Sequence, residues 1–373
     1  MRIVLDPQIF NDQKYGGISR YYTEIFSRLA HHEKIQIPLF QTANVYLKES
    51  DLLTPKQKRN SLMVDLMSKL GISTRSIVRK NQAKIFNSTI NSWEYDLFIP
   101  TYYDDYFLDK IHDKPFVLTV YDMIHELFPE KFHDNHYNVA ANKKKLMEKA
   151  TRIIAVSNNT KKDIVSIYPH IDASKIDVIY HGVSIQCDDT LAVSLPEKYI
   201  LYVGNRSNYK NFNFFVTALK ETLLNHPDLV ILCAGSGAFT AEEKEFFVQL
   251  GISNQMVQKD FKEKELGLFY QKAQCFVFPS IYEGFGIPVL ESMACGCPIV
   301  LGNHSSFPEV ASEAGFYFDL NSPDDLRSKV ELLLSDASLR NEYIQKGLAQ
   351  ASKFSWDVAA EQCLEVYKKA IKQ

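Results

Sequence analysis

Short runs of apolar residues recur along this 373-residue chain, and segments of helical length separate them. Gly, Pro, Asn or Asp, the residues that end strands, flank each run. Strands that alternate with helices in this way build parallel sheets whose faces are covered by helices. The predicted strands are residues 3–5, 97–99, 116–120, 153–156, 178–180, 199–203, 229–234, 275–278, 299–301 and 315–318.

The alternation occurs twice, with a polar, acidic and aperiodic break at residues 184–196. A chain of this length holds about two domains. We therefore expect an α/β protein with two doubly wound, Rossmann-like domains that face a cleft, at residues 1–185 and 186–353. Residues 354–373 form a last helix that crosses back onto the first domain. It begins near Trp356, and Val358, Cys363, Val366 and Ile371 fall on one stripe.

Composition excludes several classes of protein. The net charge of −3 gives no basic field for nucleic acid, and no window has the roughly 18 apolar residues that span a bilayer. The start, MRIVLDPQIF, indicates a strand and no signal peptide. Six scattered cysteines indicate reduced thiols in a cytoplasmic protein, and Cys295 and Cys297 alone do not make a four-ligand zinc site. No metal site is predicted.

Residues 56–84 depart from this average. Leu62, Met63, Leu66, Met67 and Leu70 form a helical stripe there. Such a helix either lies on an anionic membrane surface or is an ordinary surface helix whose stripe meets the core. The segment has one acid, Asp65, and eight bases: Lys56, Lys58, Arg59, Lys69, Arg75, Arg79, Lys80 and Lys84.

A glycine-rich loop follows the strand at 275–278 and leads into a helix at Pro288. Proline suits the first turn of a helix, and Gly284 and Gly286 let the backbone approach a ligand closely. The free N–H groups of such a helix, at the carboxyl edge of a parallel sheet, bind anions such as a diphosphate. Phe285 and Ile287 stand in the same loop, on either side of Gly286.

Two glutamates flank this loop, Glu283 within it and Glu291 in what we expect to be the first turn of the helix. A carboxylate accepts two hydroxyl hydrogen bonds, so one could hold a ribose and the other a sugar ring. The alternative is that Glu291 is only a favourable charge near a helix N-terminus.

A second loop, residues 203–211, follows the strand that opens the second domain. It carries Gly204, Asn205, Arg206 and Lys210. The two cations could neutralise a diphosphate, or the loop could simply be solvated. A short Gly-Ser-Gly turn after Ala234 lacks the full dinucleotide fingerprint.

In the first domain, Gly16 and Gly17 precede a helix and permit close approach to phosphate. The strand at 116–120 is followed by Tyr121, Asp122, His125 and Glu126. Any of the last three could orient a sugar hydroxyl at the cleft.

In order and spacing, these motifs resemble glycosyltransferase family 4, retaining enzymes of the GT-B fold, over nearly the whole chain. Glu283 and Glu291 match the family's E-x7-E motif, and residues 204–211 match its glycine-led loop ending in Lys-Asn. Further matches are Gly16-Gly17, Pro308-Glu309 and Phe354-Ser355-Trp356.

The resemblance implies roles for these residues. Glu291 would bind the nucleotide ribose and Glu283 a hydroxyl of the donor sugar. Arg206 and Lys210 would bind the diphosphate, which the Gly16-Gly17 loop would also approach. The chain departs from the family pattern at two places: Asn205 stands where many members have arginine, and Tyr121 where many have histidine. Asp122 keeps its place and is the first-domain candidate for catalysis, with Tyr121 and His125 as sugar contacts.

The resemblance thus predicts a retaining transfer of a hexose from a nucleotide sugar to a carbohydrate or lipid-linked hydroxyl acceptor, without a cofactor or metal. The form of the Gly204–Asn211 loop is similar to that of bacterial mannosyl- and rhamnosyltransferases of polysaccharide assembly, which favours GDP-mannose. UDP-glucose and other donors remain open. The rivals are a GT-B epimerase or phosphorylase, a Rossmann oxidoreductase and a non-enzymatic sugar-binding module.

Overall fold

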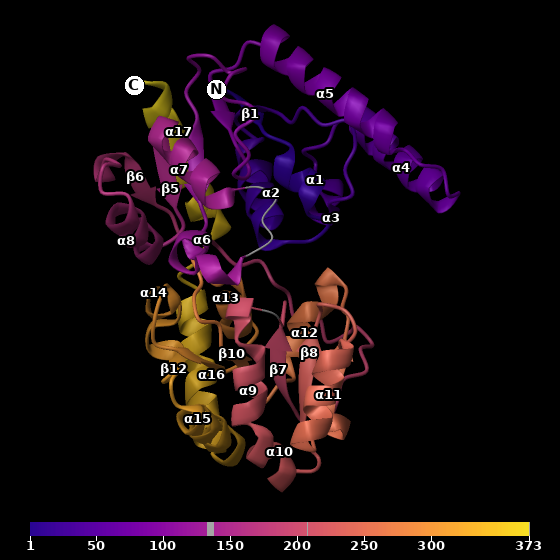
Figure 1. The fold of residues 1–373 in the computed structure, drawn as a ribbon, viewed down its shortest axis with the longest axis vertical. Coiled ribbons are helices and arrows are strands. Elements are labelled where there is room, and N and C mark those ends of the chain that lie inside the picture. The colour runs from indigo at the N-terminus through magenta and orange to yellow at the C-terminus, as the bar shows by residue number, and fades with distance from the viewer. Residues whose placement is uncertain (133–137, 207, 373) are drawn as a thin grey trace. The chain divides into compact units, whose positions relative to one another are not determined.

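The computed structural model describes residues 1–132, 138–206 and 208–372 and divides into two units (Figure 1). Unit 1 comprises Met1–His181 and Trp356–Gln373, and unit 2 comprises Gly182–Ser355. Each unit contains parallel strands connected through helices, so the expectation of two Rossmann-like units is confirmed. The domain limits expected from the sequence fell after residues 185 and 353.

Unit 1 has two three-stranded sheets, in the orders β2-β1-β3 and β4-β5-β6. A single parallel bridge between Phe98 and Phe116 links them. All five strand pairs or bridges of the described unit are parallel. The strands are β1 (Arg2–Leu5), β2 (Lys34–Gln36), β3 (Leu97–Ile99), β4 (Val117–Val120), β5 (Arg152–Ala155) and β6 (Ile176–Val178).

Helices follow these strands in the α/β order. They are α1 (Gln8–Asp12), α2 (Gly17–Leu29), α3 (Val45–Glu49), α4 (Pro55–Lys69), α5 (Arg75–Ser92), α6 (Ile124–Leu127), α7 (Val139–Lys149), α8 (Asn158–Ile167) and α17 (Trp356–Ile371). Short 3-10 helices span Pro129–Lys131 and Ala173–Lys175.

Unit 2 has one six-stranded parallel sheet in the order β12-β11-β10-β7-β8-β9. This is the strand order of dinucleotide-binding folds, in which the chain starts in the middle and winds outward in both directions. The strands are β7 (Tyr199–Val203), β8 (Val230–Ala234), β9 (Met256–Lys259), β10 (Cys275–Phe278), β11 (Ile299–Gly302) and β12 (Gly315–Phe318).

The core of unit 2 shows why alternate strand residues are apolar. Ile200 and Tyr202 of β7 point to one face of the sheet, where they join a buried cluster with Phe215, Leu326 and Val330. The helices are α9 (Phe212–Ala218), α10 (Lys220–Asn225), α11 (Ala241–Leu250), α12 (Leu266–Gln271), α13 (Ile287–Ala294), α14 (Phe307–Ala311), α15 (Pro323–Ser335) and α16 (Ala337–Ala351). Four 3-10 helices span Asn208–Lys210, Ser253–Gln255, Glu263–Glu265 and Ser312–Ala314.

Three strands differ from the sequence prediction. β2 and β9 were not predicted, and β6 ends at Val178, where the predicted strand was to begin. All three are edge strands, and β2 and β9 carry polar residues (KIQ and MVQK) because one edge of each is unpaired. The apolar pattern that marks central strands is therefore weak in them.

The basic segment at residues 56–84 also differs from the expected single helix. Thr54 and Gln57 form a capping box at the start of α4, and α4 ends at Lys69. Gly71 follows with φ +75, a left-handed conformation that ends the helix, and α5 starts at Arg75. The segment is a pair of helices joined by a turn.

The last helix packs within unit 1, as predicted, but with a different face. Val358 and Ile371 are exposed, and the buried stripe runs through Ala359, Cys363 and Val366. Trp356 is 2% exposed, and its ring lies 6.1 Å from that of Tyr21 in α2 and 5.7 Å from that of His181. The stripe follows the i, i+4, i+7 spacing, to which Val358 does not belong.

Replacing Trp356 with Ala tests this anchor. We expect the free energy of unfolding to fall by about 3–5 kcal/mol, because a fully buried aromatic side chain leaves a large cavity. The matched control is Val358→Ala on the same helix, 51% exposed, with an effect within about 0.5 kcal/mol. Urea unfolding measures both, and equal small effects would show that α17 does not stabilise unit 1.

Candidate functional site

The strand order of unit 2 creates a switch point between β7 and β10. From β7 the chain winds toward β8 and β9, and from β10 it winds toward β11 and β12. In open α/β sheets, ligands bind at the carboxyl ends of the two strands that meet at such a switch point. The loops that follow β7 and β10 are the two singled out by the sequence.

Lys210 and Glu283 meet at this point, 73 residues apart in the chain. Lys210 Nζ lies 2.5 Å from Glu283 Oε1, and the two side chains are 19% and 14% exposed. Nζ also lies 4.8 Å from the ring centre of Tyr209 and 5.4 Å from that of Phe278. Burial is the largest single influence on Lys210 and lowers its pKa, but Glu283 and Tyr209 together raise it by more through charge and hydrogen bonding, so the net pKa is raised and the amine is charged.

Backbone contacts hold the two loops together. The N–H of Ile281 donates to the carbonyl of Tyr209 at 2.8 Å. The hydroxyl of Ser306 donates to the carbonyls of Glu283 and Phe285, both at 3.0 Å. Gly286 follows with φ +92, which a side chain would strain, and starts α13. Glu283 is thus set by three neighbouring segments.

Glu291 lies deeper than expected. It is the fifth residue of α13, so the prediction that it stands in the first turn is wrong: the helix starts at Ile287, one residue before Pro288. Glu291 is 4% exposed, and the hydroxyl of Tyr270 in α12 donates to its Oε2 at 3.2 Å. Its carboxylate therefore faces α12 beneath the helix N-terminus, while Glu283 faces Lys210.

Arg206 points away from this pair in the described structure. Its guanidinium forms an ion pair with Glu243 at 2.7 Å, and the side chain is 5% exposed. It also donates to the carbonyls of Gly235, Gly237 and Ala238 at 3.2–3.3 Å, and it stacks on the ring of Phe239. These contacts tie the turn after β8 to the loop after β7. A role in binding diphosphate stays a prediction.

The other residues predicted for unit 2 line the same two loops. Gly204 has φ +102, and Asn205 is exposed, with its carbonyl accepting from the Tyr202 hydroxyl at 2.6 Å. Gly284 and Phe285 are buried, and Ile287 opens α13. Ser207 lies outside the described residues.

Unit 1 has a switch point of its own, between β1 and β3. Asp6 ends β1 there and is fully buried. The Tyr106 hydroxyl donates to its carboxyl group, and the Thr101 hydroxyl donates to it at 3.4 Å. Burial raises the pKa of Asp6 to about 7. The sequence analysis missed this residue, although its position directly after the first strand was a usable signal.

Gly16 and Gly17 stand at the start of α2, as expected. The Ser19 hydroxyl and the Arg20 N–H both donate to the Gly16 carbonyl, at 3.0 Å each. Gly17 is exposed and begins the helix. The Ser19 N–H of the first turn donates to Gln13 Oε1 at 3.2 Å, so a role of this helix N-terminus in phosphate binding stays a prediction.

The residues after β4 separate into two groups. Tyr121 is a core residue, with its ring 5.8 Å from Tyr21 and 6.2 Å from Tyr22. Asp122 is partly exposed and accepts from the Ile124 N–H at 3.1 Å. His125 is half-buried, and burial followed by the charge of Lys143 lowers its pKa.

Lys143 of α7 is a second residue that the sequence analysis missed. Its side chain is fully buried, and Nζ donates to Glu126 Oε2 and to the Asp122 carbonyl, both at 2.9 Å. Nζ also lies 3.7 Å from Asp122 Oδ1. This lysine holds the loop that carries the first-domain candidates. Its signal in the sequence, one lysine in KKK, could not be separated from solvated neighbours.

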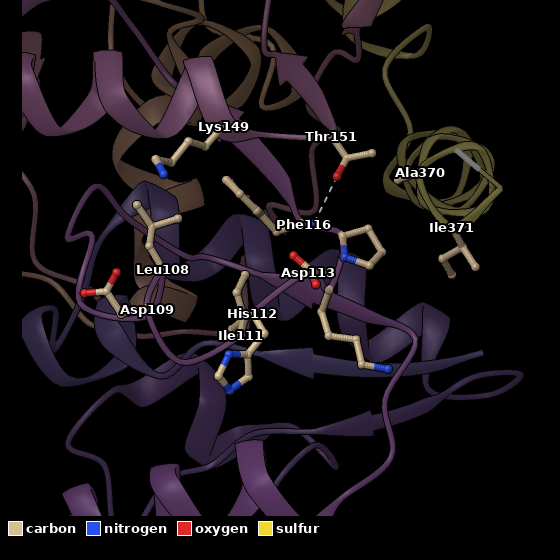
Figure 2. A pocket seen from close by; sticks show the side chains of 12 residues that line it. Leu108, Asp109, Ile111, His112, Asp113, Phe116, Lys149, Thr151, Ala370 and Ile371 are labelled. Atoms are coloured by element: carbon tan, nitrogen blue, oxygen red, sulfur yellow. Dashed lines mark hydrogen bonds between the residues drawn. The ribbon is translucent and has the colours of Figure 1, made fainter.

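A cavity of about 530 Å³ lies in unit 1, away from the carboxyl ends of the strands (Figure 2). Phe116 and Thr151, which line it, directly precede β4 and β5, so it opens at the amino ends of these strands. None of the predicted site residues lines it.

At the unit 2 switch point, the arrangement offers one charged amine, one carboxylate and a helix N-terminus within two adjoining loops. A cation and the positive end of a helix suit a diphosphate, and a neighbouring carboxylate suits sugar hydroxyls. Two family models match the chain: residues 189–350 match Glycosyl transferases group 1, and residues 68–186 match Glycosyltransferase Family 4. The first match includes Lys210 and Glu283. Each match covers less than half of the chain, one mainly in unit 2 and the other mainly in unit 1.

Two relatives act in polysaccharide assembly by their names. O-antigen chain mannosyltransferase B of Escherichia coli is 33% identical over 46% of this chain. O-antigen chain mannosyltransferase RfbU of Salmonella typhimurium is 28% identical over 61% of this chain. The matched stretches span 45% and 64% of these relatives, less than two thirds of their length.

The glycosyltransferase fold extends over both units. The crystal structure of Anabaena HepE in complex with UDP and glucose matches with a TM-score of 0.73, covering 99% of each chain at 17% identity. This confirms the GT-B class for the fold.

Arg206→Met separates the two possible roles of Arg206. If the guanidinium holds the turn after β8, the ligand-free protein loses about 2–4 kcal/mol of stability, because Glu243 and three carbonyls lose their partner. Arg327→Met is the matched control: its ion pair with Asp324 is exposed and contributes below about 1 kcal/mol. Unchanged unfolding together with weaker nucleotide binding would instead make Arg206 a diphosphate ligand.

Asp6 gives the protein a pH dependence of stability. Its pKa is about 7 when folded and 3.8 ordinarily, so the folded state holds a proton that the unfolded state releases. Stability is therefore full below about pH 4 and falls as pH rises toward about 7. Between about pH 5 and about pH 8, the parent should lose about 3 kcal/mol relative to Asp6→Asn. Urea unfolding at both pH values measures this, with the exposed Asp228→Asn as control, and parallel curves for parent and Asp6→Asn would contradict it.

Proposed function

We propose that this protein transfers a hexose from a nucleoside diphosphate to a hydroxyl group of a carbohydrate or lipid-linked acceptor, with retention of anomeric configuration. Mannose from GDP-mannose is the first choice of donor. The observation that carries the proposal is the contact between Lys210 and Glu283 at the switch point of unit 2.

The contact places a phosphate-binding group beside a sugar-binding group. Lys210 supplies a buried positive charge, and the N-terminus of α13 adds N–H groups next to it. A donor diphosphate would draw Lys210 away from Glu283, and the released carboxylate would accept hydroxyl groups of the sugar. Glu291, on the side of α13 that faces α12, would take the ribose.

Catalysis on this scheme is mainly electrostatic. The bond between the sugar C1 and the diphosphate oxygen breaks, and the acceptor oxygen forms a bond to C1 on the same face. The acceptor proton passes to the departing phosphate oxygen. Lys210 and the helix N-terminus stabilise the negative charge that grows on the leaving group, so the scheme needs no metal ion.

The choice of mannose is supported by the names of the relatives, two O-antigen mannosyltransferases. UDP-glucose is the second candidate. The HepE complex contains UDP and glucose, but 17% identity carries the fold and does not decide between donors.

A panel of nucleotides tests the reaction class and the donor together. Thermal unfolding is followed with GDP-mannose, GDP, UDP-glucose, UDP and NAD. Stabilisation by a nucleotide sugar supports the transferase, and stabilisation by NAD alone would establish an oxidoreductase. Pyridoxal phosphate absorbance in the purified protein would indicate the phosphorylase, and conversion of the donor to its epimer without an acceptor would indicate the epimerase.

Two variants test the site itself. Lys210→Ala should weaken nucleoside diphosphate binding by about 10–100-fold, since a charge-assisted contact is lost. Glu283→Gln should have the opposite effect on binding: GDP binds about threefold to tenfold more tightly, because Lys210 no longer has a competing carboxylate. Transfer of the sugar should nevertheless become slower, because the amide of glutamine has one accepting oxygen for the sugar hydroxyls where the carboxylate has two.

The matched controls are Lys346→Ala and Glu342→Gln. These two residues form a 2.6 Å ion pair on the exposed face of α16, so neither change should alter nucleotide binding. Calorimetric titration with GDP measures all four variants. If Glu283→Gln weakened GDP binding as much as Lys210→Ala, the proposal that the diphosphate replaces Glu283 as the partner of Lys210 would be wrong.

A further inference from the structure

The helical pair formed by α4 and α5 carries an unusual surface, which we call the hairpin tip and define as residues 62–80. Figure 1 shows the two helices extending away from the rest of unit 1. No residue of the tip is buried. Six large apolar side chains of the tip are 47–69% exposed to solvent: Leu62, Met63, Leu66, Leu70, Ile72 and Ile77.

The base of the hairpin explains why it keeps its shape. Asn60 and Ser61 of α4 are buried, and the Asn60 amide donates to the Phe40 carbonyl at 3.0 Å. Phe86 and Ile90 of α5 are buried in the core. The residues that meet the core are therefore not those of the predicted stripe, since Leu62, Leu66 and Leu70 are exposed.

The charges around the tip have one sign. Arg75, Arg79 and Lys80 are exposed on α5, and Lys69 is exposed at the end of α4. The one acid of the segment, Asp65, is already paired with Lys48 at 2.7 Å. This excess of positive charge stands out in a chain with a net charge of −3.

Apolar and basic side chains share the same faces. Leu62, Leu66 and Leu70 follow i, i+4, i+8 along α4, and Arg59 lies beside Leu62 and Met63 at i+3 and i+4. On α5, Ile77, Lys80 and Lys84 share the face opposite the buried Phe86.

We propose that the hairpin tip docks on an anionic lipid surface. Aliphatic side chains would enter the boundary between headgroups and acyl chains, and the lysines and arginines would contact the phosphates. None of the helices in the described ranges has the length and apolar character needed to cross a bilayer, so the contact is peripheral. The surface is separate from the donor site and does not depend on the proposed reaction.

Other occupants fit less well. Residues 56–84 contain no aromatic side chain on which a nucleic-acid base could stack. A second copy of this chain would bring a second set of the same positive charges against the tip. An anionic bilayer satisfies both the apolar and the basic side chains.

Vesicle flotation of the full chain tests the proposal. We expect the parent to float with vesicles of phosphatidylcholine and phosphatidylglycerol and to stay behind with pure phosphatidylcholine. Leu62→Ser/Leu66→Ser/Leu70→Ser and, separately, Arg75→Gln/Arg79→Gln/Lys80→Gln should each reduce the bound fraction by about tenfold or more. Added salt should weaken binding of the parent.

Lys244→Gln and Val248→Ser are the controls. Both residues are exposed on α11 of unit 2, so these changes should leave flotation unchanged. Thermal unfolding checks that the tip variants stay folded, which we expect because the substituted positions are exposed. Equal flotation of parent and tip variants, or no preference for anionic vesicles, would overturn the proposal. A drop in molar mass by light scattering in the leucine variant, without any lipid binding by the parent, would assign the tip to a second copy.

Discussion

Every strand pair in the described ranges is parallel, and this constraint organises the rest of the molecule. Parallel strands need a crossover after each strand, so the loops that leave their carboxyl ends gather at one edge. Where the winding reverses, two such loops adjoin without a helix between them. In unit 2 these loops supply Lys210 and Glu283, and in unit 1 the corresponding place holds Asp6 and Thr101.

The ligand-free site of unit 2 is electrically balanced. Lys210 is charged and nearly buried, and such a charge is costly to bury unless a partner neutralises it. Glu283 does so in the absence of a donor. The same carboxylate is the group that the proposed reaction needs for the sugar, so the pair connects stability without ligand to function with it. Arg206 has its own partner in Glu243 and serves the neighbouring turn.

Apolar strands were predictable, and the polar edge strands were not. The strands β7 and β10 matched their predicted limits, because buried central strands are continuously apolar. β2 and β9, with one edge unpaired, carry polar residues and gave no such signal. Similarly, Gly71 divides the basic segment into two helices, although the spacing of the leucines alone was compatible with one.

The sequence alone determined which loops matter, because glycines, a helix-starting proline and charged residues after apolar runs are local signals. It placed Lys210, Glu283 and Glu291 near one sheet edge. Tertiary structure alone decided their partners. Lys210 faces Glu283, Arg206 faces Glu243, Glu291 of α13 faces Tyr270, and Tyr121 packs in the core. Side-chain direction depends on contacts between residues that are distant in the chain, which no local pattern encodes.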